Sequence, residues 1–380
     1  MITNWLDTRF RLRFNIIFGS NRFGFDRWIS VSKVLWIIGN GFDKNLGLKT
    51  GYRSFLLNKY FAPGETNEYR DELVRRLDTF DPKSQSDLWS DLERLLGEVS
   101  QYYEDDVDLF HETFEDIQRQ LLEYVAQEAG RLPNEFPPAA IDEFRESLCL
   151  FSRRLEALDQ IEAIPEVIPS ENAWVSAISL NYTNSFDSLW NSAIHDEKLN
   201  SVANGAAVIS FYPDHLLHLH GVVDSSCNGD SPIFGVSDQS QISSSLCSED
   251  PDFIELWVKS ERNASLLRNT KGQMMASLVS SANAICIYGC SLGLSDAYIW
   301  KIVGRRITTS ATRLYIFDHE LPDRRTGSFR RFQTRRKDLI DSFLKAAEIK
   351  EPDKETANKH IVPVESSKIF KFDSLLKLSV

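Results

Sequence analysis

Five apolar runs, each about as long as a β-strand, constrain what this chain can fold into more than any other feature. They cover residues 34–38, 175–180, 216–219, 284–288 and 314–317, and residues 206–211 are a candidate for a sixth. Most of the runs are continuous rather than alternating, which is typical of strands buried on both faces of a parallel sheet. The pattern predicts an α/β fold with a mostly parallel sheet.

Small and polar residues gather directly after each of the first four runs, where Gly, Asn, Asp, Ser and Thr are frequent. In an open parallel sheet, ligands bind in the crevice outside the carboxyl ends of the strands. We therefore expect the loops that follow these runs to form one ligand-binding site.

A long interval with the periodicity of α-helices separates the first two runs. Apolar residues recur there every three or four positions, as on the buried face of an amphipathic helix. We expect residues 61–170 to form a helical insertion in, or a cap over, a core made of residues 32–60 and 171–320. Residues 1–31 are interpreted as an N-terminal extension, and residues 321–380 as a basic segment that packs on the core.

Charge and cysteine content restrict the compartment and the partners. The formal net charge of −12 gives no general attraction to nucleic acid or to an anionic membrane. The five cysteines include no CxxC pair, which favours a reducing compartment over a disulfide framework or a cysteine-rich zinc module. Because no apolar run approaches the ~20 residues that a membrane span requires, we expect a cytoplasmic protein that does not enter a membrane.

Two segments carry opposite charge. Residues 98–128 hold ten acidic residues and one basic residue, as in a solvated helix face or a surface that binds a partner. Residues 324–337 are rich in Arg and also contain Phe329 and Phe332. Such a segment can grip single-stranded nucleic acid, pair with the acidic insertion, or bind the phosphates of a nucleotide.

The loop after the first run is the first candidate for ligand binding. Its residues are Gly39, Asn40, Gly41, Phe42 and Asp43. Glycines let the backbone approach a phosphate, and free N–H groups at the turn and helix start would bind it; a plain turn with Asp43 as N-cap is the other interpretation. Thr50 and Tyr52, just downstream, can close over a ligand, although Tyr52 suits the core equally well.

The next two loops offer side chains that suit a sugar. Asn181 and Thr183 can hold ribose hydroxyls or orient a water molecule, or they belong to a capped turn. His218 and His220 point to the same face of a strand, and His220 precedes Gly221 at its end, where an imidazole can act as a base. His218 lies deeper, and we see no further ligands that would make the pair a metal site.

The loop after the fourth run contains a second glycine-rich turn. Gly289, Ser291 and Gly293 suggest another close approach of the backbone to a ligand. Either Ser295 or Asp296 is positioned to cap the helix that follows. This loop completes the set of four strand-end loops.

Taken in order, the four loops resemble the bacteriophage abortive infection family AbiH. The hallmark of that family is IIGNGFD followed by GLxTxY, and it also has NYT, LHG and GxSLxxSD segments. This chain matches them at residues 37–43, 47–52, 181–183, 219–221 and 289–296. The resemblance covers roughly residues 33–320 and implies an antiphage role.

The same order is also similar to a divergent sirtuin-type NAD fold, which implies a Rossmann-like sheet. On the matching positions, the resemblance implies that Asn181 and His220 are the catalytic pair. It assigns the phosphates to residues 39–41, and the adenosine half of NAD to Gly289 and Ser291. The other candidate contacts to the cofactor are Phe42, Asp43, Thr50, Tyr52, Thr183, Gly221 and Asp296.

Two departures from the sirtuin pattern bear on activity. Sirtuin deacetylases carry a four-cysteine zinc module that shapes their peptide groove, and this chain has no CxxC pair, so protein deacetylation is not expected. The Asp that usually stands two residues after the Asn is Thr183 here, which alters the ribose contact.

Hydrolysis of NAD at its nicotinamide N-glycosidic bond is the activity that this resemblance favours, because antiphage proteins with sirtuin-like domains use the site to deplete NAD. Asn181 would orient the water or ribose, and His220 would engage a ribose hydroxyl or act as base. A phage-derived trigger would start the reaction. One alternative is a nucleotide-sensing or nucleic-acid-binding module without turnover, and another is a homo-oligomer formed through the acidic insertion.

Overall fold

The computed structural model describes residues 32–62, 64, 67–76, 92–155, 172–204, 207–223, 232–249, 254, 257–259, 270–322 and 329–372. The interpretation of residues 1–31 as an extension lies outside the described residues, as do Arg324 and Arg325 of the basic segment.

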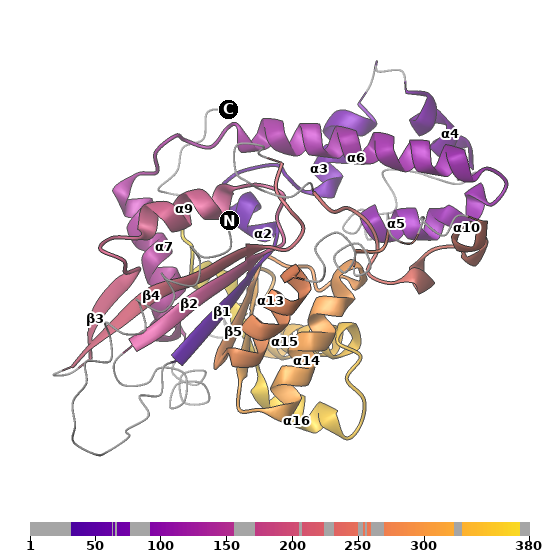
Figure 1. Ribbon diagram of the computed structural model, residues 1–380. Helices are drawn as coiled ribbons and strands as arrows, with labels where there is room; N and C mark the ends of the chain where they lie inside the picture. Colours follow the sequence, from indigo (N-terminus) through magenta and orange to yellow (C-terminus); the bar gives the residue numbers. More distant parts are fainter. Residues whose placement is uncertain are drawn as a thin grey trace, which may run out of the picture. The chain divides into compact units, whose positions relative to one another are not determined.

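A seven-stranded sheet lies at the centre of the described residues (Figure 1). Its strands, in spatial order, are β3 (Asn200–Asn204), β4 (Ala207–His218), β2 (Asn172–Ser179), β1 (Ser32–Ile38), β5 (Ala284–Tyr288), β6 (Arg313–Asp318) and β7 (Ile361–Glu365). β3 runs antiparallel to β4, and the other neighbouring pairs are parallel. The predicted α/β class with a mostly parallel sheet is confirmed.

The strand order creates a switch point between β1 and β5. From β1 the chain proceeds through β2 to β4 on one side, and it then returns to β5 on the other side of β1. Apart from the antiparallel β3, this is the order of the doubly wound sheet that binds dinucleotides in the crevice at its switch point. The loops after β1 and β5 therefore lie at the position where such a sheet accepts a ligand.

The five predicted strands are present. The candidate strand at 206–211 is not a separate one, because residues 207–211 belong to β4, which continues through 216–218 as a single strand. Pro213 lies within it, next to a register shift against β2 between Val175 and Ala177. A β-bulge of this kind accommodates a proline, which cannot donate to the ladder of hydrogen bonds. The edge strands β3 and β7 were not predicted.

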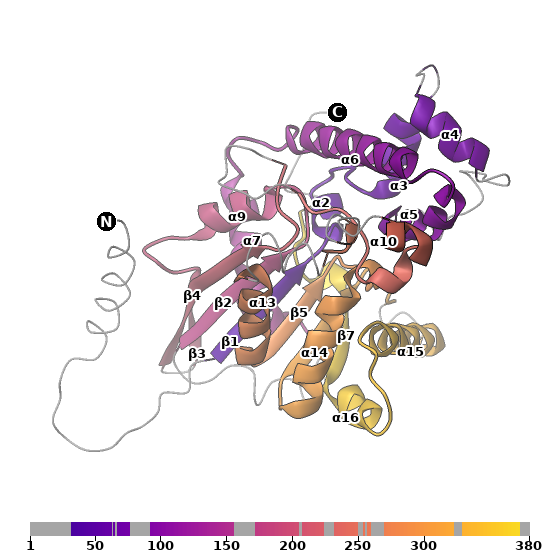
Figure 2. The same cartoon turned by 45° about the vertical axis from the view of Figure 1, so that its right-hand side comes forward.

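Helices cover both faces of the sheet (Figures 1 and 2). They are α2 (Gly41–Asn45), α3 (Tyr52–Phe55), α4 (Glu68–Arg76), α5 (Leu92–Val99), α6 (Val107–Ala129), α7 (Pro138–Leu150), α9 (Ser185–Ala193), α10 (Ser244–Glu249), α13 (Thr270–Ser281), α14 (Ala297–Thr309), α15 (Phe329–Ala346) and α16 (Asp353–His360). Shorter turns are η1 (Leu56–Tyr60), η3 (Ser100–Tyr103), η4 (Phe151–Arg154), η5 (Gln239–Gln241), η6 (Leu294–Asp296) and η8 (Ser366–Lys368). Among the described helices, none combines the length and the apolar character needed to cross a membrane.

Successive residues of β1 face two different cores, because side chains alternate along a strand. Trp36 belongs to the core that α7 and α9 form on one face. Ile37 belongs to the core on the other face, which α13, α14 and α15 complete. Both residues have no exposed surface, so the continuous apolar run of β1 follows directly from burial on two sides.

The helical segment between β1 and β2 divides into two parts. Helix α7 packs on the sheet through Phe144 and Leu148, which lie four residues apart on one side of the helix. Helices α5 and α6 instead form a third core with Phe234 and Trp257, from the chain between β4 and β5. The segment 321–380 does more than pack on the core, because it supplies the edge strand β7.

The turns after β1 and β5 touch through their backbones at the switch point. The N–H of Gly39 donates to Tyr288 O at 2.9 Å, and the N–H of Gly41 donates to Gly289 O at 2.8 Å. A Cβ on Gly41 would lie 2.4 Å from the Cα of Gly289, which is closer than two carbon atoms can pack. Gly289 has a φ of +71°, a conformation that favours glycine. Close approach of two loops therefore accounts for both glycines.

Replacing Gly41 with Ala should destabilise the protein. The added Cβ would meet backbone atoms of Gly289, which cannot move aside as the end of a flexible side chain can. We expect Gly41→Ala to lower the free energy of unfolding by about 1–3 kcal/mol, measured by urea denaturation. Gly130→Ala is the matched control, since its Cβ would meet nothing closer than 3.4 Å. Equal stability of the two variants would contradict this account of the turn.

Candidate functional site

Asp43 fixes the loop after β1 to the loop after β2. It lies in the first turn of α2 and is 1 % exposed. The hydroxyl of Thr183 lies 3.0 and 2.8 Å from the two carboxylate oxygens, and the hydroxyl of Ser185 also donates to Oδ1. Burial raises the pKa of Asp43 to about 6, and these two hydrogen bonds oppose the rise. Thr183, which we expected at a ribose, contacts Asp43 here.

Asn181 is a buried amide that the surrounding protein does not satisfy. The residue is 4 % exposed, and its amide lies near enough to Asp43 to help hold down the pKa of that carboxyl group. Even so, within the described residues neither Nδ2 nor Oδ1 has a hydrogen bond of good geometry. A buried polar group without a partner costs about 1–3 kcal/mol, so its retention points to a ligand that completes it.

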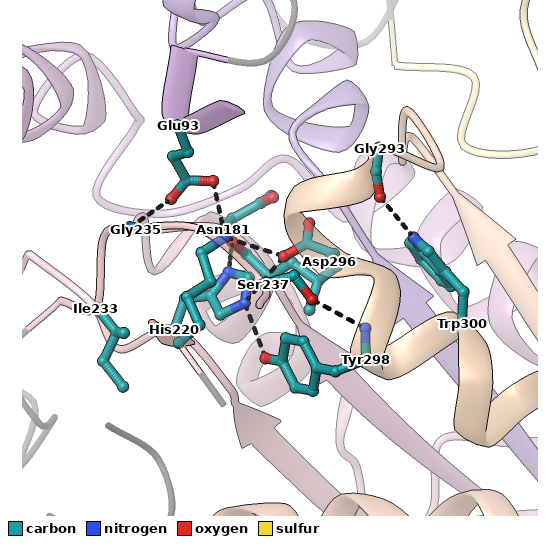
Figure 3. Close-up of polar contacts among 12 residues, drawn as sticks. Glu93, Asn181, His220, Ile233, Gly235, Ser237, Gly293, Asp296, Tyr298 and Trp300 are labelled. Carbon is teal, nitrogen blue, oxygen red and sulfur yellow. Dashed lines mark hydrogen bonds and ion pairs between the residues drawn. The ribbon is translucent and has the colours of Figure 1, made fainter. Parts of the chain in front are cut away.

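His220 follows β4, and Figure 3 draws its side chain together with those of Asn181, Asp296 and Tyr298. Its Nδ1 is 3.3 Å from the carbonyl oxygen of Leu180, the residue before Asn181. Its Nε2 is 3.3 Å from the hydroxyl of Tyr298 and 3.4 Å from Asp296 Oδ1. Burial, and after it the positive charge of Lys259, lowers the pKa of His220 to about 3. The imidazole is therefore neutral at physiological pH.

Three charged side chains lie beside His220: Glu93 and Lys259 are buried, and Asp296 is 19 % exposed. The ammonium group of Lys259 is 2.7 Å from Glu93 Oε2 and 3.0 Å from Asp296 Oδ1. Burial would lower the pKa of Lys259, but the two carboxylates outweigh it and hold that pKa above its ordinary value. Glu93 Oε1 also accepts from the Tyr182 hydroxyl at 3.2 Å and from the Gly235 N–H at 3.2 Å. The two carboxylates and one ammonium carry a net charge of one negative unit.

Several of the predicted contacts serve the protein itself. Gly39 and Gly41 donate their N–H groups to carbonyls of β5 and the turn after it. The Phe42 ring is fully buried, with a ring centroid 5.2 Å from that of Phe186. The Thr50 hydroxyl donates to Asn40 Oδ1, and Tyr52 packs against Phe234. Gly221 has a φ of +77° and turns the chain after His220.

The structure thus brings Asp43, Asn181, Thr183, His220 and Asp296 to one end of the sheet. Ser291 is exposed, and no described contact joins it to this group. The Nε2 atom of His218 lies 2.7 Å from Asp187 of α9. His218 therefore joins β4 to α9 and is not placed in this group. Whether any of these residues contacts a nucleotide stays a prediction.

Sequence reasoning missed Glu93, Lys259 and Tyr298 as members of the site. Lys259 and Tyr298 carry no signal of their own in the sequence. Glu93 carries a weak one, because the small residues Gly97, in the same helix α5, and Ser100, at the start of η3, follow it at the spacing of one helix face. A Cβ on Gly97 would lie 2.5 Å from Gln241 O, and Ser100 Oγ accepts from the Ser243 N–H at 2.9 Å. Small residues thus let α5 approach closely enough to bury Glu93.

The described part of the basic segment pairs with neighbouring acids, not with the acidic insertion. Arg335 lies 2.7 Å from Asp318 Oδ2 and 3.0 Å from Glu320 Oε2, at the end of β6. Phe332 is buried in α15, whereas Phe329 is 60 % exposed. Arg330 and Arg331 are exposed beside it.

A comparison with protein families places this geometry in context. The sequence model of the family described as bacteriophage abortive infection AbiH matches residues 35–318. A search of curated proteins finds no match. The matched residues run from β1 to the end of β6, and so include each of the strand-end loops described above.

Asp43 should give stability a specific pH dependence. Because its pKa is raised from 3.8 to about 6 by folding, the folded protein binds this proton more tightly than the unfolded chain. Its contribution to stability is therefore present below about pH 4 and is lost as the pH rises through about 6. The two-unit shift corresponds to about 3 kcal/mol.

We expect Asp43→Asn to remove this dependence. Urea denaturation from pH 4 to 7.5 measures the unfolding free energy of wild type and variant. In the difference between the two, the effects of the titrating groups that they share cancel. The wild type should lose about 2–3 kcal/mol relative to the variant over that range. A difference that does not change with pH would show that Asp43 titrates normally.

Proposed function

The chain belongs to the bacteriophage abortive infection AbiH family, and we propose that it acts by hydrolysing NAD at the nicotinamide N-glycosidic bond. Membership indicates a role in defence against phage. Loss of NAD would halt the metabolism of an infected cell, which is what abortive infection requires. A phage-derived trigger would release the activity.

The unsatisfied amide of Asn181 is the observation that carries the proposal. It lies after β2, next to the residue whose carbonyl contacts His220. The strand order around it is that of sheets that bind dinucleotides at the carboxyl ends of their strands. A nucleotide ribose, with its hydroxyl groups, supplies both the donors and the acceptors that this amide lacks.

Cleavage of this bond does not require the protein to donate a proton to the leaving group. The C1′–N bond breaks, its electron pair goes to the nicotinamide nitrogen, and nicotinamide leaves as a neutral molecule. Water oxygen bonds to C1′ and releases one proton, giving ADP-ribose. The sugar is positively charged in between, so the protein must position the ribose and stabilise that charge.

The described residues fit these tasks. Asn181 would hold a ribose hydroxyl or orient the attacking water. Neutral His220 would accept a hydrogen bond from a ribose hydroxyl at Nε2, in exchange for the one from Tyr298. A pKa of about 3 makes His220 a weak base, which favours this role over proton abstraction. The net negative charge of Glu93, Lys259 and Asp296 would favour the cationic sugar.

A nucleic-acid-binding module without turnover is the second candidate. Phe329, Arg330 and Arg331 are exposed together at the start of α15, and an aromatic ring beside arginines can hold a single-stranded base and its phosphates. For this candidate, binding of single-stranded oligonucleotides should fall with salt and be lost in Arg330→Ala/Arg331→Ala. The NAD proposal expects the same variant to keep full NAD hydrolysis.

Production of nicotinamide tests the NAD proposal directly. The purified protein, and cells expressing it during phage infection, are assayed for loss of NAD and for nicotinamide and ADP-ribose. We expect His220→Ala and Asn181→Ala each to lower the rate by about 100-fold or more. His195→Ala is the matched control, because that side chain is 79 % exposed and should leave the rate unchanged.

Two outcomes would refute the proposal. One is protection against phage with no loss of NAD and no nicotinamide. The other is a rate of nicotinamide release that His220→Ala leaves intact.

A further inference from the structure

Lys259 is a buried cation that joins a helix between β1 and β2 to the loop after β5. Its side chain is 1 % exposed, and its ammonium group contacts Glu93 of α5 and Asp296 of η6. A lysine is almost never so fully buried unless it is paired, and here both partners are carboxylates. The three residues come from parts of the chain that are far apart in sequence.

Lys259 and His220 share one oxygen atom. Asp296 Oδ1 is 3.0 Å from Lys259 Nζ and 3.4 Å from His220 Nε2. The other imidazole nitrogen faces the Leu180 carbonyl, which can only accept, so a neutral imidazole carries its proton on Nδ1. Its Nε2 then accepts from the Tyr298 hydroxyl at 3.3 Å. A second proton, on Nε2, would be stabilised by the negative charge of Asp296, which the ammonium group of Lys259 already balances at 3.0 Å.

We propose that Lys259 is a positioning residue for His220: held by Glu93, it balances the negative charge of Asp296 and so keeps the imidazole neutral, with Nε2 as a hydrogen-bond acceptor. For its catalytic consequence this inference rests on the proposed NAD hydrolysis. Its structural content, the charge state of His220, does not depend on that activity.

The charges around His220 agree with this assignment. Burial is the largest cause of the lowered pKa of His220, and Lys259 is the next. Asp296 acts in the opposite direction, and Lys271 of α13 adds to the effect of Lys259. Tyr182 and Tyr298 also face the imidazole, and burial raises the pKa of each phenol, so both are neutral.

Charge balance predicts what happens when the pair is removed. Glu93→Gln/Lys259→Met deletes one charge of each sign and so leaves the net charge of the cluster at one negative unit. Asp296 then keeps its negative charge with Oδ1 unoccupied, beside His220 Nε2. We expect His220 to bind a proton and replace Lys259 as the partner of Asp296.

Histidine NMR of the full-length chain tests this. The protein is labelled with ¹³C-histidine, and the His220 signal is identified by its loss in His220→Gln. In wild type His220 should stay neutral down to about pH 4, since its pKa is about 3. In Glu93→Gln/Lys259→Met the midpoint should rise by about one to three pH units. In Lys259→Arg, which keeps the charge, it should stay low.

A folded Glu93→Gln/Lys259→Met protein in which His220 titrates as in wild type would overturn the inference. If circular dichroism shows that this variant does not fold, Glu93→Gln/Lys259→Gln takes its place, because it removes the same two charges and keeps a polar side chain at position 259. The same upward shift is expected there, and its absence would equally overturn the inference.

The NMR result separates this inference from the proposed function. A shifted midpoint in a protein that leaves NAD intact would refute the hydrolysis but keep the role of Lys259. If NAD is hydrolysed, the acid limb of the pH–rate profile should move to higher pH in the folded double variant by the same amount as the NMR midpoint. Hydrolysis with an unmoved midpoint would refute the role of Lys259 alone.

Discussion

The contact between the backbones of Gly41 and Gly289 is the constraint on which the rest of the site depends. It brings the loops after β1 and β5 together at the switch point of the sheet. This contact fixes the position at which α2 begins. Asp43, in the first turn of α2, then lies against the loop after β2. The hydroxyls of Thr183 and Ser185 bond to it there. Asn181 lies in that same loop, and His220 lies in the neighbouring loop, which follows β4.

Buried charge is concentrated on one side of this arrangement. Lys259 contacts the carboxylates of both Glu93 and Asp296. Glu93 also accepts hydrogen bonds from a backbone N–H and a tyrosine hydroxyl. Removing charges from water is costly, and a buried ion pair is weak evidence for stability alone. The cluster lies against His220, so its effect on the imidazole is a reason for its presence that stability does not provide. It also makes α5 part of the site, although α5 belongs to a separate core.

The family assignment and the fold limit the possible functions without deciding the reaction. AbiH membership indicates defence against phage, and the strand order indicates where a ligand binds. Sheets of this kind serve many chemistries, so function has to be argued from the site. In this site an unsatisfied amide, a neutral imidazole and a net negative charge occur together, and these suit a sugar that becomes cationic.

The sequence alone determined the class of fold and the four loops that contribute to the site. Continuous apolar runs require burial on two faces, and Asn181 and His220 follow such runs directly, so local pattern was sufficient for them. It did not determine that residues 207–218 form one strand, because Pro213 interrupts the apolar pattern and the continuity of the strand is seen only in its pairing with β2. Nor did it reveal Lys259 or Glu93, or that the glycines of the first loop pack against another loop. Those properties depend on contacts between residues far apart in the chain, and only the tertiary structure decides which buried charges become neighbours.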